Sequence, residues 1–158
     1  MTIVWNSTLN TGIDVIDSQH RRIVSYINAL EEARAAKDRT RVGHIIEQLV
    51  DYTQSHFGFE ESLMEEAGYR FLKPHQKVHE LFIKRVNSFT VRAAKGEDIS
   101  DELHTMLSTW LLNHIAHEDR DYAASVKRMA DAEERTQPAP VVQAKRKSLL
   151  RQFFGLGN

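Results

Sequence analysis

The chain has 158 residues, about the size of one domain, with 41% hydrophobic residues, 27% charged residues and a formal net charge of −1. This charge balance is not that of a general nucleic-acid binder, and the absence of cysteine excludes disulfides, cysteine-ligated iron–sulfur clusters and thiolate zinc sites. A chain without cysteine suits a reducing compartment, so we expect a cytoplasmic protein. The start, MTIVWNSTLN, lacks the pattern of a signal peptide, and no apolar run approaches the ~20 residues of a membrane span.

The first two predicted helices occupy residues 17–37 and 40–67. The first has inward positions at the four-three spacing of a bundled helix: Ile16, His20, Ile23, Ile27 and Leu30. Gly68 is a natural stop for the second helix. The expected inward positions of this second helix are Val42, Ile45, Leu49, Tyr52, His56 and Leu63.

Two further helices are predicted after Pro74 and after Ser100. Pro74 is favourable in the first turn of the third helix, and Gly96 ends it; its inward positions are His75, His79, Phe82, Val86 and Phe89. Ser100 is the expected N-cap of the fourth helix, with acidic residues favourably placed in its first turn. The inward positions of this helix are Leu103, Leu107, Trp110 and His114.

Four long helices with short loops predict an all-α, up-down-up-down four-helix bundle. All four inward faces carry histidine: His20, His56, His75, His79 and His114. Burying such groups without partners would cost roughly 1–3 kcal/mol each, so something must satisfy them. A lone histidine in a core is usually hydrogen-bonded to a neighbour, but five converging ones favour a metal site.

The spacing within the helices supports a metal site. Side chains four residues apart share a helix face, so His75 and His79 can address one ion, while Glu60 lies beside His56 and can reach between two ions. We interpret His44 and His104 as surface or structural residues. His117 lies three residues after His114, but its charged neighbours indicate solvent.

A second bridging carboxylate is expected after His114, where Glu118, Asp119 and Asp121 are candidates. Simple i+4 geometry favours Glu118. The apolar pattern instead slips by one residue and continues through Ile115, Asp119, Tyr122, Val126 and Met129. Normal helical drift or a π-bulge would produce such a slip, and π-bulges are frequent at functional sites. The slip turns Asp119 inward, so we predict Asp119 rather than Glu118.

These motifs together resemble the hemerythrins, and in particular the single-domain bacteriohemerythrins. The resemblance covers Trp5 to about Tyr122. Its motifs are W-x-x-x-L-x-x-G-I-x-x-I-D-x-Q-H at residues 5–20, H-F-x-x-E-E-x-x-M at 56–64, G-Y at 68–69, H-x-x-x-H at 75–79 and W-L-x-x-H-I-x-x-x-D-x-x-Y at 110–122. Every ligand position of the family pattern holds the expected residue type.

The resemblance implies a domain at residues 1–134 with two non-haem iron ions joined by a bridging oxo or hydroxo group. His75, His79 and His114 would bind one iron, His20 and His56 would bind the other, and Glu60 and Asp119 would bridge them. Dioxygen would bind at an open position of the second iron. The pocket around it would be lined by apolar residues that also serve as core: Ile23, Phe57, Trp110, Leu111 and Ile115.

The expected function is reversible binding of dioxygen, by a carrier, store or delivery protein rather than an enzyme. Di-iron oxidases in helical bundles use more carboxylates. Two ferrous ions with two carboxylates and one hydroxide leave the core at a net charge of about +1, which disfavours high-valent iron. Two alternatives stay open: a di-iron enzyme of peroxidase or nitric oxide reductase type, and an oxygen or redox sensor that signals through its C-terminal tail.

The tail, residues 135–158, is predicted to be a linker followed by a basic amphipathic segment able to form a short extra helix. After Pro138 and Pro140 it contains four basic residues and no acidic one. Its apolar residues share one helix face: Leu149, Leu150, Phe153 and Phe154. Such a segment fits contact with its own bundle, a sister subunit, a protein partner or an anionic membrane surface.

Overall fold

The computed structural model describes residues 2–136. They form a short 3₁₀-helix and a run of helices: η1 (Ser7–Leu9), α1 (Asp14–Ala35), α2 (Arg39–Glu66), α3 (Leu72–Ala94), α4 (Ser100–His114), the π-helix η2 (Ile115–Asp119) and α5 (Arg120–Thr136). The chain divides into two compact units, Met1–Lys127 and Arg128–Asn158. No helix in the described part of the chain is long and apolar enough to span a membrane. The predicted basic segment of the tail lies outside the described residues.

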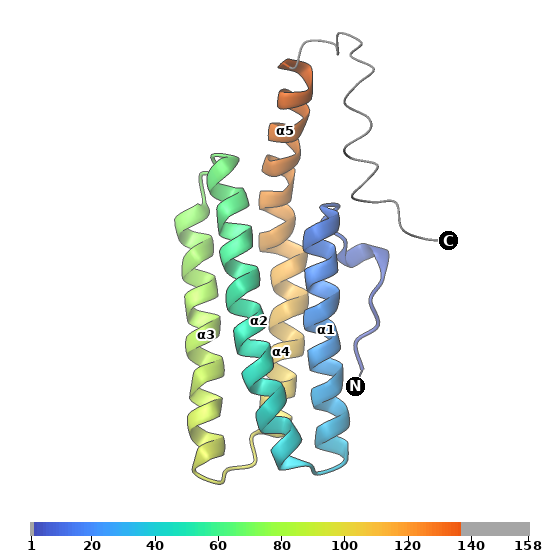
Figure 1. Cartoon of the computed structure of the whole chain (residues 1–158), viewed down its shortest axis with the longest axis vertical. Coiled ribbons are helices and arrows are strands. Elements are labelled where there is room, and N and C mark those ends of the chain that lie inside the picture. Colours follow the sequence, from blue (N-terminus) through green and yellow to red (C-terminus); the bar gives the residue numbers. More distant parts are fainter. Residues whose placement is uncertain (1, 137–158) are drawn as a thin grey trace, which may run out of the picture. The chain divides into compact units, whose positions relative to one another are not determined.

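The first unit is the predicted all-α bundle. Helices α1 to α4 run side by side with alternating direction (Figure 1), and α1 packs against both α2 and α4. Gly68 and Gly96 follow the ends of α2 and α3 in the left-handed conformation, at φ 60° and 86°. The backbone N–H of Tyr69 then donates to Met64 O at 2.9 Å, which satisfies a carbonyl at the end of α2. The short turns thus bring neighbouring helices together in antiparallel pairs.

The core follows the predicted inward faces closely. Every predicted inward position of α1 and α3 is buried, but on α2 Tyr52 and Leu63 are only half-buried, which corrects the prediction. Their neighbours Thr53 and Met64 are buried in their place. A straight α-helix drifts against a seven-residue repeat, so over this long helix the buried stripe moves on by one residue.

The start of α4 also differs from the prediction. Ser100 is the first helical residue rather than the N-cap, which is Ile99. The hydroxyl of Ser100 donates to Asp98 Oδ1 at 2.7 Å, and its backbone N–H donates to the same oxygen at 3.3 Å. Asp98 therefore satisfies a backbone N–H at the start of α4, although Ile99 occupies the N-cap position. Asp101 and Glu102 occupy the first turn, as predicted.

Candidate metal centre

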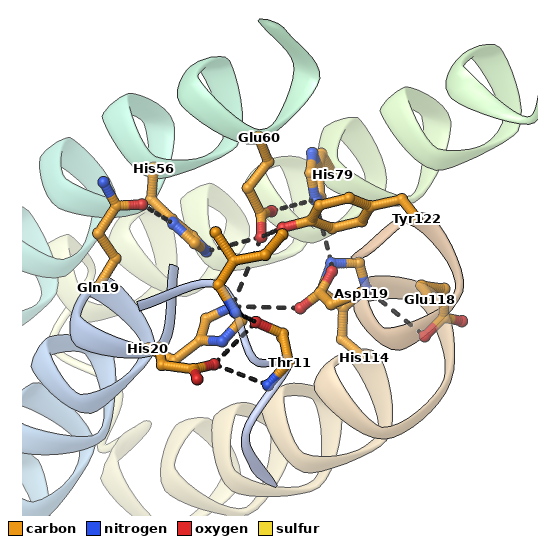
Figure 2. A network of polar contacts seen from close by, with 12 residues as sticks. Thr11, Gln19, His20, His56, Glu60, His79, His114, Glu118, Asp119 and Tyr122 are labelled. Carbon is orange, nitrogen blue, oxygen red and sulfur yellow. Dashed lines mark hydrogen bonds and ion pairs between the residues drawn. The ribbon is translucent and has the colours of Figure 1, made fainter. Parts of the chain in front are cut away.

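Five imidazoles and two carboxylates meet inside one half of the bundle. They are His20 on α1, His56 and Glu60 on α2, His75 and His79 on α3, His114 at the end of α4, and Asp119 on η2. None of the seven is more than 3% exposed. The labelled members of this set point toward one another in Figure 2. The structure therefore brings together all the residues that the sequence predicts as ligands.

Three histidines form one side of this cluster. His79 Nε2 lies 3.0 Å from His75 Nε2 and 3.0 Å from His114 Nε2. Lone pairs on neutral imidazoles repel at that distance unless a cation or a proton lies between them. Two nitrogens bound to one ion at about 2.1 Å and at right angles would be about 3.0 Å apart, so this spacing suits a metal.

Two histidines form the other side, and the carboxylates serve both. Glu60 Oε1 lies 3.5 Å from His56 Nε2 and 3.6 Å from His20 Nε2, while Glu60 Oε2 lies 3.5 Å from His79 Nε2. Asp119 Oδ2 lies 3.2 Å from His20 Nε2, and its Oδ1 lies 3.1 Å from His114 Nε2. Each carboxylate thus presents one oxygen to each group of histidines, which is the arrangement needed to bridge two ions.

The π-helix explains how Asp119 enters the centre. Five residues, Ile115–Asp119, have π-helical geometry between α4 and α5. A π-turn inserts one residue, so the inward face moves from His114 to Ile115 and Asp119. Asp119 is fully buried, whereas the side chain of Glu118 is 42% exposed, with Oε2 lying 3.6 Å from His114 Nδ1. Of the two causes considered for the slip, the π-helix is the one present.

The electrostatics of the cluster separate its histidines. Burial lowers the pKa of His79 to about 2, and charge repulsion from the imidazoles of His114 and His75 acts in the same direction. Burial also lowers the pKa of His56 to about 4. Burial opposes charge on His20 too, but the carboxylates of Asp119 and Glu60, with oxygens 3.2 Å and 3.6 Å from His20 Nε2, outweigh it and raise the pKa of His20 to about 9. At neutral pH His79 and His56 are therefore neutral and able to bind a cation.

Buried polar atoms without hydrogen-bond partners show whether these seven residues fit a metal. Among the described residues, several buried atoms of the cluster have no hydrogen-bond partner: both nitrogens of His20, Glu60 Oε2, His114 Nδ1 and both oxygens of Asp119. Each such atom costs roughly 1–3 kcal/mol when left unsatisfied. Three of these four residues direct an unpaired ring nitrogen or carboxylate oxygen at the interior of the cluster. Nitrogen and oxygen donors of this kind fit a first-row transition metal, so the donor set suits a metal centre.

Several residues that sequence analysis did not assign to the centre support it from outside. Gln19 Oε1 lies 2.7 Å from His56 Nδ1, and Glu61 Oε1 lies 2.9 Å from His79 Nδ1. The hydroxyl of the fully buried Tyr122 donates to Glu60 Oε1 at 2.6 Å. Burial and the negative charge of Glu60 raise the pKa of Tyr122, so this hydroxyl keeps its proton. The sequence indicates the roles of Gln19 and Glu61 through their positions beside predicted ligands: Gln19 directly precedes His20, and Glu61 directly follows Glu60.

The segment before α1 covers His20. Asp17 accepts from the backbone N–H of Thr11 at 2.7 Å and from its hydroxyl at 2.8 Å, which fixes this loop to the first turn of the helix. The ring of Trp5 then lies 6.3 Å from the ring of His20. The N-terminal motif of the sequence therefore closes this end of the cluster.

The remaining histidines stay outside the cluster. His44 is exposed, and His117 is exposed with Nδ1 2.8 Å from the carbonyl of Asn113. His104 is buried, with Nε2 3.4 Å from Glu31 Oε2, so it is structural. None of the three belongs to either group of candidate ligands among the described residues.

The five apolar residues that the resemblance assigns to the pocket lie in or against the hydrophobic core, and two of them stack on cluster histidines. Ile23, Phe57, Leu111 and Ile115 are buried in the core, and Trp110 packs against it half-buried. The ring of Phe57 stacks on His79 at 3.7 Å, and that of Trp110 stacks on His114 at 4.3 Å. These stacked rings fix the orientation of two imidazoles and exclude water from their faces.

Comparison with known proteins identifies relatives of the whole bundle. The family model "Hemerythrin HHE cation binding domain" matches residues 11–126. A "Bacteriohemerythrin" of Stenotrophomonas maltophilia is 58% identical over 125 residues, which cover 79% of this chain and 82% of the relative. A "Bacteriohemerythrin" of Pseudomonas aeruginosa is 54% identical over the same shares. A solved structure described as "Crystal structure of hemerythrin:wild-type" shares the fold, with a TM-score of 0.75 and 24% identity over 80% of this chain and 98% of that one.

Proposed function

This chain belongs to the hemerythrin family, and from that premise we propose that it binds dioxygen reversibly at a centre of two non-haem iron ions. The observation that carries the proposal is the buried set of five imidazoles and two shared carboxylates. When bound, iron with an open position supplies the electrons and the coordination that dioxygen needs. The sequence predicts a binding protein rather than an enzyme, and membership in this family confirms that prediction. The cytoplasmic location remains a prediction.

The proposed ligands fall into the same two groups that the distances in the structure define. His75, His79 and His114 would hold one ion, and His20 and His56 would hold the other, so the second ion would have fewer protein ligands. Glu60 and Asp119, whose oxygens reach both groups of histidines, would be shared by the two ions, and an oxo or hydroxo group would complete the core. Tyr122 fixes Glu60 through its hydrogen bond and so positions one bridge.

The apolar residues around the centre determine what reaches it. Ile23, Phe57, Trp110, Leu111 and Ile115 offer no acid or thiol that could deliver a proton. Bound dioxygen can leave the centre in a reduced form, and this reaction requires water or protons. A pocket that excludes water therefore slows the reaction. Retention of intact dioxygen therefore depends on these five apolar side chains, which we call the pocket wall.

Reversibility is tested by cycling the iron-loaded protein between air and nitrogen. The expected result is a visible absorption that appears with oxygen and disappears on its removal over repeated cycles. An oxygen carrier releases the gas unchanged, whereas an enzyme of peroxidase or nitric oxide reductase type consumes an added reductant with turnover. Continuous turnover without recovery of the starting spectrum would contradict the carrier function.

Leu111→Asn is expected to shorten the lifetime of the oxygen complex severalfold while leaving iron content similar. The substitution places an amide in a wall where the native side chain is only 3% exposed, so water gains access to the centre. The decay of the oxygen spectrum in air measures the effect. Leu81→Asn is the matched control, because Leu81 is 55% exposed on α3. Equal decay rates in the two variants would show that this wall does not control access.

A further inference from the structure

The outer nitrogens of the cluster's histidines have unlike partners on its two sides. His79 Nδ1, on the three-histidine side, lies 2.9 Å from a carboxylate oxygen of Glu61. His56 Nδ1, on the two-histidine side, lies 2.7 Å from the side-chain amide oxygen of Gln19. Both oxygens only accept, so both Nδ1 atoms carry hydrogen and both Nε2 atoms present a lone pair to the centre. The two sides share this tautomer but differ by one negative charge.

Glu61 is itself held in place. Its second oxygen accepts from Gln76 Nε2 at 3.0 Å, so one side chain of α3 fixes the carboxylate that another, His79, contacts. The ring of Phe57 stacks on His79 with an interplanar angle of 7°. The imidazole is therefore restrained on its face by Phe57 and at its edge by Glu61.

Glu118 does not duplicate this arrangement. Its Oε2 lies 3.6 Å from His114 Nδ1, which is too long for a hydrogen bond, and that nitrogen has no partner among the described residues. His20 Nδ1 likewise has none. Within the described part of the chain, Glu61 is thus the carboxylate that is hydrogen-bonded to the outer nitrogen of a proposed ligand.

A carboxylate that accepts from the outer nitrogen raises the basicity of a ligating imidazole and fixes its orientation. A more basic ligand stabilises the more highly charged state of the ion it binds. An amide oxygen orients the ring in the same way but contributes no charge. The two sides of the centre therefore have unequal electronic support.

We propose that Glu61 is a positioning residue that aims His79 Nε2 at the centre and, through His79, favours the ferric state of the ion on the three-histidine side. Gln19 is its neutral counterpart for the other ion. This inference rests on the proposed function only for the identity of the metal. The orientation of His79 is a property of the chain itself.

The charge is tested with Glu61→Gln, which keeps the shape of the side chain and removes its charge. The expected result is a higher reduction potential of the iron-loaded protein than in the parent. Glu80→Gln is the matched control, since Glu80 lies in the same groove between α2 and α3, carries the same charge and pairs with Lys77 instead of a histidine. Gln19→Glu is expected to move the potential the opposite way. A shift in Glu61→Gln no larger than in Glu80→Gln would overturn the electronic part of the proposal.

The orientation is tested without iron. In the metal-free chain, ¹⁵N NMR of the imidazoles should show His79 protonated at Nδ1, a mixture of tautomers in Glu61→Ala, and recovery in Glu61→Gln. Zinc titration of the same variants should show about ten- to a hundredfold weaker binding for Glu61→Ala, a typical loss for such supporting residues. Unchanged tautomer and zinc affinity in Glu61→Ala would overturn the positioning role. A chain that binds zinc as expected but fails to bind oxygen would instead contradict the proposed function alone.

Discussion

Replacing His79 with alanine is expected to lower bound iron from two ions per chain to at most one and to abolish the oxygen-dependent visible absorption. His79 Nε2 lies 3.0 Å from the matching nitrogens of both other histidines on its side, and 3.5 Å from Glu60 Oε2. Its removal takes away one of three imidazoles and unstacks Phe57. The ion on that side would keep two histidines, and a bridging carboxylate would lose its orientation. Metal analysis and the visible spectrum measure the loss.

His44→Ala is the matched control for this substitution. The side chain of His44 is 74% exposed and lies 3.7 Å from Glu47 Oε2, away from the cluster, so its loss should leave iron content and spectrum unchanged. His104 is less suitable, because it is buried against Glu31 and its removal affects packing. His20→Ala probes the other side of the centre and should also impair it. If His79→Ala folds and retains both ions with normal oxygen binding, the ligand assignment on α3 is wrong.

The sequence predicts the bundle well because its signal is periodic. Apolar residues at four-three spacing place Ile16 and Phe89 in the core, and the same spacing places the five histidines on inward faces. The one-residue slip after His114 was visible in the same way, as a break in that period. Its cause needed the structure, since helical drift and a π-turn both shift the pattern by about one position.

The parts that sequence analysis missed depend on contacts between helices. Gln19 and Glu61 stand in the quoted motifs, but the sequence does not show what they contact, and only the packing of α1 against α2, and of α2 against α3, brings each to a ring nitrogen. The Tyr122 hydroxyl reaches Glu60, 62 positions away in the chain, for the same reason. Periodicity tells which face turns inward. It does not tell which neighbour across the interface a polar group will contact.

The most direct test of the central claim, a two-ion centre formed by these seven residues, is the metal content of the protein produced with ample iron. Seven buried donors, with two carboxylates each reaching both groups of histidines, are too many for a single ion. The expected result is two iron ions per chain, with a visible absorption that depends on oxygen. One zinc ion per chain, with no visible absorption after reconstitution with iron, would contradict it.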